Sequence, residues 1–160
     1  MILVVGDTHQ CSGALKAVIA LAREHKPELL IHTGDNYRDY LGLARELNLP
    51  SYGVPGNCDH EEVPEELCFS HGGKQFFLVH GHQYNVKVGL TDLARRGKQL
   101  GAHCVVFGHT HVPLMEQHES LLLVNPGSIP WPRVGSKPGY AWLSILGESI
   151  TGSLRPLHSS

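Results

Sequence analysis

Short apolar runs alternate with helical patterns through the first half of the chain, and this alternation restricts the fold more than any other feature. The runs stop at or near glycine and proline, as buried strands do, and the expected strands are Ile2–Val5, Leu29–Ile31 and Ser51–Val54. Apolar side chains recur at helical spacing from Leu15 to Ala22, and a shorter helix is expected over Tyr40–Leu47. This order favours a parallel sheet with helices packed against it.

The second half of the chain has the pattern of hairpins. Apolar residues at 68–69 and 76–79 flank Gly72-Gly73, which predicts a hairpin. A helix is expected over Thr91–Leu100 and a buried strand over Cys104–Phe107. The remaining β-like runs form two pairs, Leu114–Gln117 with Leu121–Val124 and Tyr140–Leu146 with Ile150–Leu154. We expect two packed sheets in a single α/β domain over residues 1–160, the first mostly parallel and the second mixed or antiparallel.

The composition is typical of a globular protein rather than of a nucleic-acid or membrane protein. A length of 160 residues suits one domain, and a formal net charge of −2 gives no general attraction to nucleic acid or anionic membranes. No apolar stretch approaches the roughly 20 residues of a membrane span. The four cysteines form no C-x-x-C pair, which favours a reducing compartment. We therefore expect a cytoplasmic protein with no membrane partner and no dedicated nucleic-acid surface.

Polar side chains that bind metals follow five of the apolar runs, at the positions where open α/β sheets bind their ligands. A glycine precedes several of these side chains, which predicts a tightly turning backbone. The five segments are Val5-Gly6-Asp7-Thr8-His9, His32-Thr33-Gly34-Asp35, Pro55-Gly56-Asn57-Cys58-Asp59, Val79-His80-Gly81-His82 and Gly108-His109-Thr110-His111.

The spacing of His109 and His111 leaves two kinds of metal site open. In extended backbone the two Cα atoms would lie roughly 6.5 Å apart with both rings on one side. The rings can then close on one ion or each hold one ion of a close pair. A single-zinc hydrolase that uses both rings on one ion would leave Asp35, Asn57 and His80 without a role.

The complete donor set favours two ions. It comprises seven side chains, which are too many for one tetrahedral ion and suit two ions that share a carboxylate. Mixed carboxylate, amide and imidazole donors favour Mn, Fe, Zn, Co or Ni over Mg or Ca. The candidate ligands are Asp7, His9, Asp35, Asn57, His80, His109 and His111. Two divalent cations against two carboxylates leave a net positive site, which attracts a phosphate ester.

In this order the segments read D-x-H, G-D, G-N-x-D, H and G-H-x-H, and the chain resembles the calcineurin-like metallophosphoesterases, in particular the small YfcE-type phosphodiesterases. The resemblance runs from residue 1 to about residue 146, and the segment Asn125–Ser128 also matches. It implies a four-layer α/β/β/α sandwich with two mixed β-sheets. It also implies a metal-dependent phosphodiesterase or phosphatase that acts on small phosphate esters and forms a homo-oligomer.

The resemblance also implies how the ligands divide between two ions, with manganese favoured over iron, nickel, cobalt and zinc. One ion would be held by Asp7, His9, Asp35 and His111, and the other by Asp35, Asn57, His80 and His109. Asp35 would then bridge the ions, and a water shared between them would attack phosphorus in line. Asp35 and Asn57 are accordingly the expected catalytic residues, together with a proton donor to the leaving group.

Cys58 departs from the family pattern, because many of the related phosphatases have histidine at this position. That histidine is thought to protonate the leaving oxygen or to steady the phosphoryl group. A thiol is a poor general acid for this task, so the departure favours phosphodiesters or good leaving groups over alkyl monoesters. His82 is the candidate replacement donor.

The alternative function is a non-catalytic interaction module, as in the retromer subunit of this fold. That alternative predicts lost ligands, and none is lost here. Several other polar residues are expected outside the ligand set. His32 is expected to be a hydrogen-bonded interior residue, Asp59 to orient its neighbours, Arg133 to be a surface arginine and Trp131 to form a rim or a subunit contact. The remaining histidines expected on the surface are His25, His71, His103, His118 and His158.

Overall fold

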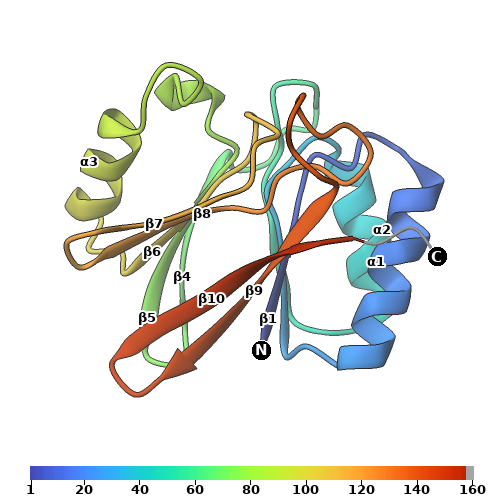
Figure 1. Cartoon of the computed structure of the whole chain (residues 1–160), viewed down its shortest axis with the longest axis horizontal. Coiled ribbons are helices and arrows are strands. Elements are labelled where there is room, and N and C mark those ends of the chain that lie inside the picture. Colours follow the sequence, from blue (N-terminus) through green and yellow to red (C-terminus); the bar gives the residue numbers. More distant parts are fainter. Residues whose placement is uncertain (158–160) are drawn as a thin grey trace.

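The computed structural model describes residues 1–157 and arranges them in four layers (Figure 1). Two five-stranded sheets face each other, with two helices outside one sheet and one helix outside the other. The helices are α1 (Ser12–His25), α2 (Tyr37–Leu47) and α3 (Thr91–Gln99), with a short 3-10 turn at His82–Tyr84. No helix within residues 1–157 combines the length and apolarity needed to cross a membrane.

The first sheet has the order β10-β9-β1-β2-β3 and lies against α1 and α2. Its strands are β1 (Ile2–Val5), β2 (Leu29–His32), β3 (Ser51–Gly53), β9 (Gly139–Leu146) and β10 (Ser149–Pro156). Strands β1, β2 and β3 are parallel, whereas β9 and β10 extend the sheet antiparallel to β1. The prediction of a mostly parallel first sheet is therefore wrong for β9 and β10, because the sequence pattern does not show which edge the last hairpin joins.

The second sheet has the order β4-β5-β6-β8-β7 and lies against α3. Its strands are β4 (Glu66–His71), β5 (Lys74–Val79), β6 (Cys104–Val106), β7 (Leu114–His118) and β8 (Leu121–Asn125). Strands β5, β6 and β8 are parallel, and β4 and β7 pair antiparallel at the two edges. Both sheets are thus mixed, as the family resemblance implied.

Alternate side chains of a strand pack into different hydrophobic cores. On β1, Ile2 and Val4 pack toward the second sheet, whereas Leu3 and Val5 pack against the helices of the first. Successive side chains of a strand point to opposite faces, so a strand that is apolar on both faces must be covered on both sides. This requirement explains the four layers and leaves the ends of the strands as the place for polar side chains.

Helix α2 begins three residues before the expected start at Tyr40. The side chain of Asn36 accepts hydrogen bonds from the backbone N–H groups of Arg38 and Asp39 and thereby caps the helix. The early start brings Asp39 into the interior beside the loop that follows β1.

Candidate metal centre

The candidate ligands gather where parallel strands of both sheets end. Asp7 and His9 follow β1, and Asp35 follows β2, in the first sheet. His80 follows β5 directly, and the segment 109–111 follows β6, in the second sheet. Strands that run parallel finish at the same edge, so each sheet delivers its polar side chains to one place. Backbone hydrogen bonds from Asp7 N to Gly34 O (2.9 Å) and from Gly108 N to His80 O (2.9 Å) fix neighbouring loops to each other.

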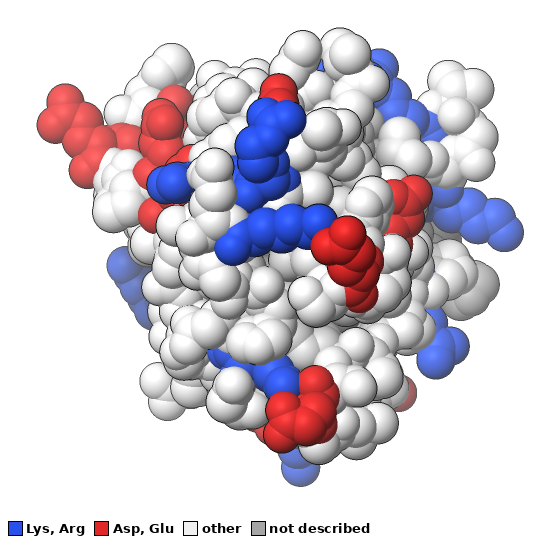
Figure 2. All heavy atoms as spheres, turned by 90° about the vertical axis from the view of Figure 1, so that its left-hand side faces the viewer, with Lys and Arg blue, Asp and Glu red and all other residues white. Residues whose placement is uncertain are grey.

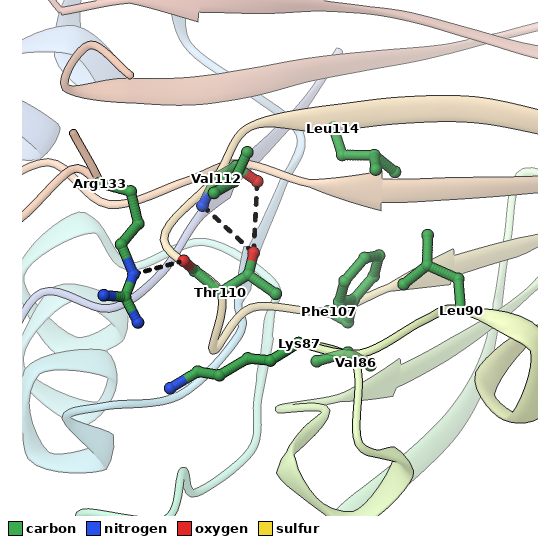
Figure 3. Close-up of a pocket in the computed structure, with 8 residues that line it drawn as sticks. All are labelled: Val86, Lys87, Leu90, Phe107, Thr110, Val112, Leu114 and Arg133. Carbon is green, nitrogen blue, oxygen red and sulfur yellow. Dashed lines mark hydrogen bonds between the residues drawn. The ribbon is translucent and has the colours of Figure 1, made fainter. Parts of the chain in front are cut away.

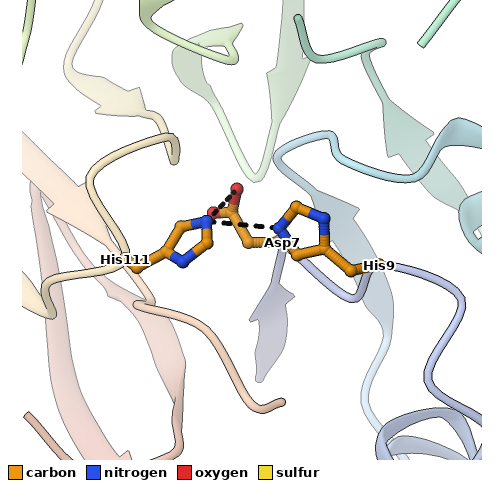
Figure 4. Close-up of side chains that lie close together, drawn as sticks. All are labelled: Asp7, His9 and His111. Atoms are coloured by element: carbon orange, nitrogen blue, oxygen red, sulfur yellow. Dashed lines mark hydrogen bonds and ion pairs between the residues drawn. The ribbon is translucent and has the colours of Figure 1, made fainter. Parts of the chain in front are cut away.

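Asp7, His9 and His111 form one side of the site (Figure 4). The two ring nitrogens, His9 Nε2 and His111 Nε2, lie 3.2 Å apart, and His111 Nε2 lies 3.3 Å from Asp7 Oδ1. One potential ligand atom from each residue lies within 4.8 Å of the other two. The chain thus joins residues that are 102 positions apart into one three-donor group.

His80 is surrounded by oxygen atoms on the other side of the site. Its Nε2 lies 3.1 Å from Asn57 Oδ1, 3.4 Å from Asp35 Oδ2 and 3.9 Å from Asp7 Oδ1. Asp7, Asp35 and His80 form a second close group of donors, and His9, Asp35 and Cys58 form a third. Both carboxylates therefore lie between the imidazoles of the two sides, and Asp7 is as central as Asp35.

Backbone carbonyls fix the orientation of two of the rings. His80 Nδ1 donates to Thr33 O at 2.7 Å, and His111 Nδ1 donates to Trp131 O at 2.8 Å. Once its Nε2 has lost its proton, each ring can present a lone pair to the centre, which is how proteins orient histidine ligands of metals. Trp131 also stacks on His9, with ring centroids 4.2 Å apart, and so forms a rim over this side.

The site fits cations on two observations. The Oδ1 atom of Asp7 is buried and has no hydrogen-bond partner within residues 1–157. A buried carboxylate oxygen without a hydrogen bond is costly, and a divalent cation would satisfy it. In addition, His80 Nε2 faces three oxygen atoms, an arrangement that holds either a proton or a metal ion.

The pKa directions agree with this arrangement. Burial opposes the charged forms of both His80 and Asp35, but their mutual hydrogen bond and attraction raise the pKa of His80 and lower that of Asp35. Desolvation lowers the pKa of His9, and it lowers that of His109 to about 4, a value to which the nearby His80 charge also contributes. The latter two rings are therefore neutral near pH 7, which is the form that binds metals.

Strained backbone coincides with the candidate ligands. Non-glycine residues seldom adopt positive φ, and such positions cluster at functional sites because the surrounding structure must hold them. Five of the candidate ligands have φ between 41° and 69°, namely Asp7, His9, Asp35, His109 and His111. This strain could not be predicted from the sequence.

The glycines beside the site are needed for space as well as for the expected tight turns. Gly34 has a positive φ of 106°, and a Cβ at Gly56 would overlap the Asp35 carboxylate. A Cβ at Gly108 would lie 2.5 Å from Thr33 Oγ1 and 2.8 Å from Asp7 Oδ2. Real Cβ atoms do not approach oxygen so closely, so an added methyl group would push the carboxylates out of place.

A buried polar chain supports the loop that carries Asp7 and His9. His32 Nε2 lies 3.0 Å from Thr8 Oγ1, and this hydroxyl donates to Asp39 Oδ2 at 2.7 Å. Burial lowers the pKa of His32 to about 3, so the ring is neutral. His32 is thus the hydrogen-bonded interior residue that the sequence predicted, whereas the roles of Thr8 and Asp39 were missed.

The segment Asn125–Ser128 forms hydrogen bonds to the loops that contain Gly108 and Asp7. These contacts give a structural reason for the resemblance of this segment to the family pattern. Asn125 Nδ2 donates to Gly108 O at 2.9 Å, and Ser128 Oγ donates to Asp7 O at 2.8 Å. Asp59 supports the loops after β2 and β3, because its carboxylate accepts hydrogen bonds from the backbone N–H groups of Asp35 and Gly56. These residues position the candidate ligands.

A cleft of about 460 Å³ lies over the site. His82 is not among the residues that line it, although its ring centroid lies 5.5 Å from that of His80 and 6.0 Å from that of His109. Its role as proton donor stays a prediction. The lining comprises His9, Asp35, Asn57, Cys58, Lys87, His109, His111, Trp131, Pro132, Arg133 and Val134.

The other histidines make contacts away from the cleft. His25 packs edge-on against Trp142, with ring centroids 5.6 Å apart. The remaining contacts are with polar partners, namely His71 with Glu28 (3.3 Å), His103 with the N–H of Gln75 (3.0 Å) and His118 with Glu116 (2.9 Å). His158, also expected at the surface, lies outside the described residues.

Comparison with known proteins identifies relatives over nearly the whole chain. The family model of the calcineurin-like phosphoesterase superfamily domain matches residues 1–148. The probable metallophosphoesterase YsnB of Bacillus subtilis is 33% identical over 151 residues, which cover 94% of this chain and 87% of YsnB. The phosphodiesterase YfcE of Escherichia coli is 31% identical over 165 residues, which cover 89% of this chain and 86% of YfcE.

Solved structures confirm the expected fold class. The structure of YfcE superposes with a TM-score of 0.68 at 20% identity and covers 98% of this chain and 99% of that one. Vps29 of Entamoeba histolytica complexed with Zn²⁺ superposes with a TM-score of 0.77 at 21% identity, again over 98% and 99% of the two chains. At these identities the likeness shows the four-layer fold with two mixed sheets and does not show the activity.

Proposed function

The chain belongs to the calcineurin-like phosphoesterase superfamily, and on this basis we propose that it hydrolyses phosphodiesters at a pair of divalent metal ions. The observation that carries the proposal is the convergence of two carboxylates and several imidazoles on one point. Asp7 Oδ1 lies there with no hydrogen-bond partner within residues 1–157, as expected of an atom made to bind a cation. Small-molecule phosphate esters are the substrate class.

The proposed ligand sets follow the two sides of the site. We propose that Asp7, His9, Asp35 and His111 hold one ion. The other ion would be held by Asp35, Asn57, His80 and His109, and Asp35 would then be the shared ligand. Manganese is the favoured ion, and zinc is the first alternative because Vps29 was solved with it. When bound, such ions acidify a water and stabilise the negative charge that develops on phosphorus oxygens.

The chain's own residues would position the ester and hold the ligand rings in place. Lys87 and Arg133 line the cleft and place positive charge where phosphoryl oxygens would lie. Trp131 covers His9 and its carbonyl keeps the His111 ring in one orientation. The carbonyl of Thr33 does the same for His80, so the two sides stay fixed while the substrate changes.

The residue at position 58 is the basis for the proposed preference for diesters. Cys58 lines the cleft, and burial together with the Asp35 carboxylate raises the pKa of its thiol. A neutral thiol donates weakly, so efficient turnover needs a leaving group that departs with little protonation. We keep His82 as the proposed donor for poorer leaving groups, acting from beside His80 and His109 rather than from the cleft wall.

A non-catalytic interaction module is the second candidate, because Vps29 shares the fold. The complete donor set favours catalysis over this candidate. Within residues 1–157 the four cysteines are free thiols, which supports a reducing compartment, and we propose a cytoplasmic protein. A homo-oligomeric state also stays a prediction.

Hydrolysis of bis(4-nitrophenyl) phosphate tests the proposal. We expect turnover with Mn²⁺ that EDTA abolishes and that added Mn²⁺ restores. Asp7→Asn should remove the activity, whereas Asp92→Asn, a matched change at a surface ion pair with Arg95, should keep it. No turnover with any divalent metal, or full activity of Asp7→Asn, would overturn the enzyme proposal and favour the interaction module.

A further inference from the structure

A second pocket, of about 480 Å³, opens beside the metal cleft (Figure 3). It falls within the size range of small-molecule sites. Its walls come from the segment before α3, from the loop between β6 and β7 and from the loop before β9. The lining residues are Val86, Lys87, Leu90, Phe107, Thr110, Val112, Leu114 and Arg133.

The pocket and the cleft share a wall and two cations. His109 and His111 line the cleft, whereas Thr110 between them lines the pocket. Lys87 and Arg133 line both cavities. In Figure 3 these two side chains lie at one end of the pocket, and the side chains of Phe107, Leu90 and Leu114 lie at the other. A molecule that spans both cavities would pass between the two cations.

Five of the eight residues that line the pocket are apolar, namely Val86, Leu90, Phe107, Val112 and Leu114. Apart from the two cations, its polar side chain is that of Thr110. The Thr110 hydroxyl already contacts Asn125 Nδ2 at 3.0 Å, Val112 N at 3.2 Å and Val112 O at 3.5 Å. Apart from the two cations, no side-chain group is therefore left to recognise the polar edges of a base or a sugar, and the mostly aliphatic lining suits an aliphatic occupant.

The two cations are available to an anionic group. Within residues 1–157 neither Lys87 nor Arg133 has a carboxylate within ion-pair distance, and Arg133 Nε makes only a hydrogen bond of 3.4 Å to Thr110 O. The basic residues of α3 differ, because acidic side chains lie among the basic ones on that face of the molecule (Figure 2). Those pairs are Arg95 with Asp92, Arg96 with Glu66 and Lys98 with Glu119.

We propose that this pocket binds an aliphatic ester arm of the substrate, while Lys87 and Arg133 hold the anionic phosphoryl oxygens at its mouth. The inference rests on the proposed function and makes it more specific, since it assigns the substrate to amphiphilic phosphodiesters with one alkyl or acyl arm. The exposed apolar side chain of Val112, 42% accessible, would be covered by that arm.

A series of 4-nitrophenyl alkyl phosphates tests the proposal on the wild-type chain. Methyl, butyl and octyl esters share one leaving group and one charge and differ only in the alkyl arm. The value of kcat/KM should rise by as much as roughly fourfold for each methylene that the pocket buries. A matched series of methyl-, butyl- and octylphosphonate should show the same order of affinity by calorimetry, without any turnover.

Val112→Asp places a carboxylate in the pocket, and Val88→Asp is its control. Val88 is 83% accessible and lies one residue beyond Lys87, outside the pocket lining. Val112→Asp should abolish the dependence on chain length, so that the methyl, butyl and octyl esters have equal kcat/KM in this variant. Val88→Asp should keep the dependence. Equal kcat/KM for all three esters in the wild type would overturn the inference even if the variant failed to fold.

The remaining outcomes separate the two proposals. Absence of turnover for every ester would remove the proposed function, and the phosphonate series would still decide whether the pocket binds alkyl arms. A phenyl or nucleoside arm that outperforms the octyl arm would contradict an aliphatic occupant. A halved molar mass of Val112→Asp in analytical ultracentrifugation would show that a second copy of the chain covers the pocket, which would also overturn the inference.

Discussion

The metal cleft and the apolar pocket lie on opposite sides of one loop and are built in different ways. The cleft side holds His109 and His111 at positive φ, with buried carboxylates and fixed rings. The pocket side holds ordinary apolar residues such as Val112 and Leu114. The proposed chemistry would therefore depend on short, strained motifs just beyond strands, whereas the shape that would choose a substrate depends on residues brought together from distant segments.

The largest expected effect is that of Asp35→Asn. Loss of the shared carboxylate charge should lower kcat/KM for bis(4-nitrophenyl) phosphate on the order of 1,000-fold or more and reduce the number of bound ions. Steady-state kinetics and metal analysis measure both effects. Val112→Asp, a substitution in the apolar pocket, should leave the metal content unchanged. A loss of bound ions in that variant would contradict the separation of the apolar pocket from the metal cleft.

Glycine substitutions should distinguish the crowded cleft from an open position in the segment before α3. Gly108→Ala would press a methyl group against Thr33 and Asp7, at a cost of roughly 1–3 kcal/mol in the free energy of unfolding. Gly89→Ala is the control, because a Cβ there would meet nothing within 4 Å. Urea denaturation measures both variants. Equal stability of the two variants would show that the cleft accommodates a methyl group at position 108 and would contradict the close packing there.

The pH dependence of stability should report the protonation of His32, the buried residue that supports the loop of Asp7 and His9. The pKa of His32 is lowered by burial from 6.5 to about 3, so the unfolded chain binds a proton more readily than the folded one between these values. Stability from this group is complete above pH 6.5 and is lost as the pH falls toward 3.

His32→Gln isolates that contribution. The variant should be less stable at pH 7 by roughly 1–3 kcal/mol, since hydrogen bonds to Thr8 and Gly34 are weakened, and should lose less stability on acidification. Thermal unfolding of the metal-free chain from pH 7 to pH 4 makes the comparison, with His118→Gln at the surface as control. An unchanged pH slope in His32→Gln would assign the acid sensitivity to other groups.

The smallest expected effect is a change of preference at the border of the cleft. Cys58→His supplies a stronger general acid, and should raise the ratio of 4-nitrophenyl phosphate to bis(4-nitrophenyl) phosphate turnover by about tenfold. Cys68→His, a matched change on β4, should leave the ratio alone. If both variants keep the wild-type ratio, position 58 does not set the preference between monoesters and diesters.

The strands and the polar segments that follow them could be predicted from the sequence, because both depend on local pattern. The edge at which β9 joins β1 could not, since the pairing of Ala141 with Val4 is a contact between distant segments. The supporting role of Ser128 beneath Asp7 was likewise missed, because only the folded chain brings its hydroxyl to the Asp7 carbonyl.

The pocket was missed for a different reason. Residues such as Leu90 and Phe107 have the same pattern as any buried apolar residue, so no motif marks them. The cleft, in contrast, concentrates residue types that are rare together. Chemical function is thus easier to predict from sequence than substrate choice.

A count of bound metal ions tests the central claim most directly. Equilibrium dialysis of the wild-type chain against Mn²⁺, followed by elemental analysis, should give two ions per chain. His80→Ala should keep the ion held by Asp7, His9 and His111 and lose the other. A single ion in the wild type, or none, would contradict the account of a site shared by two metals.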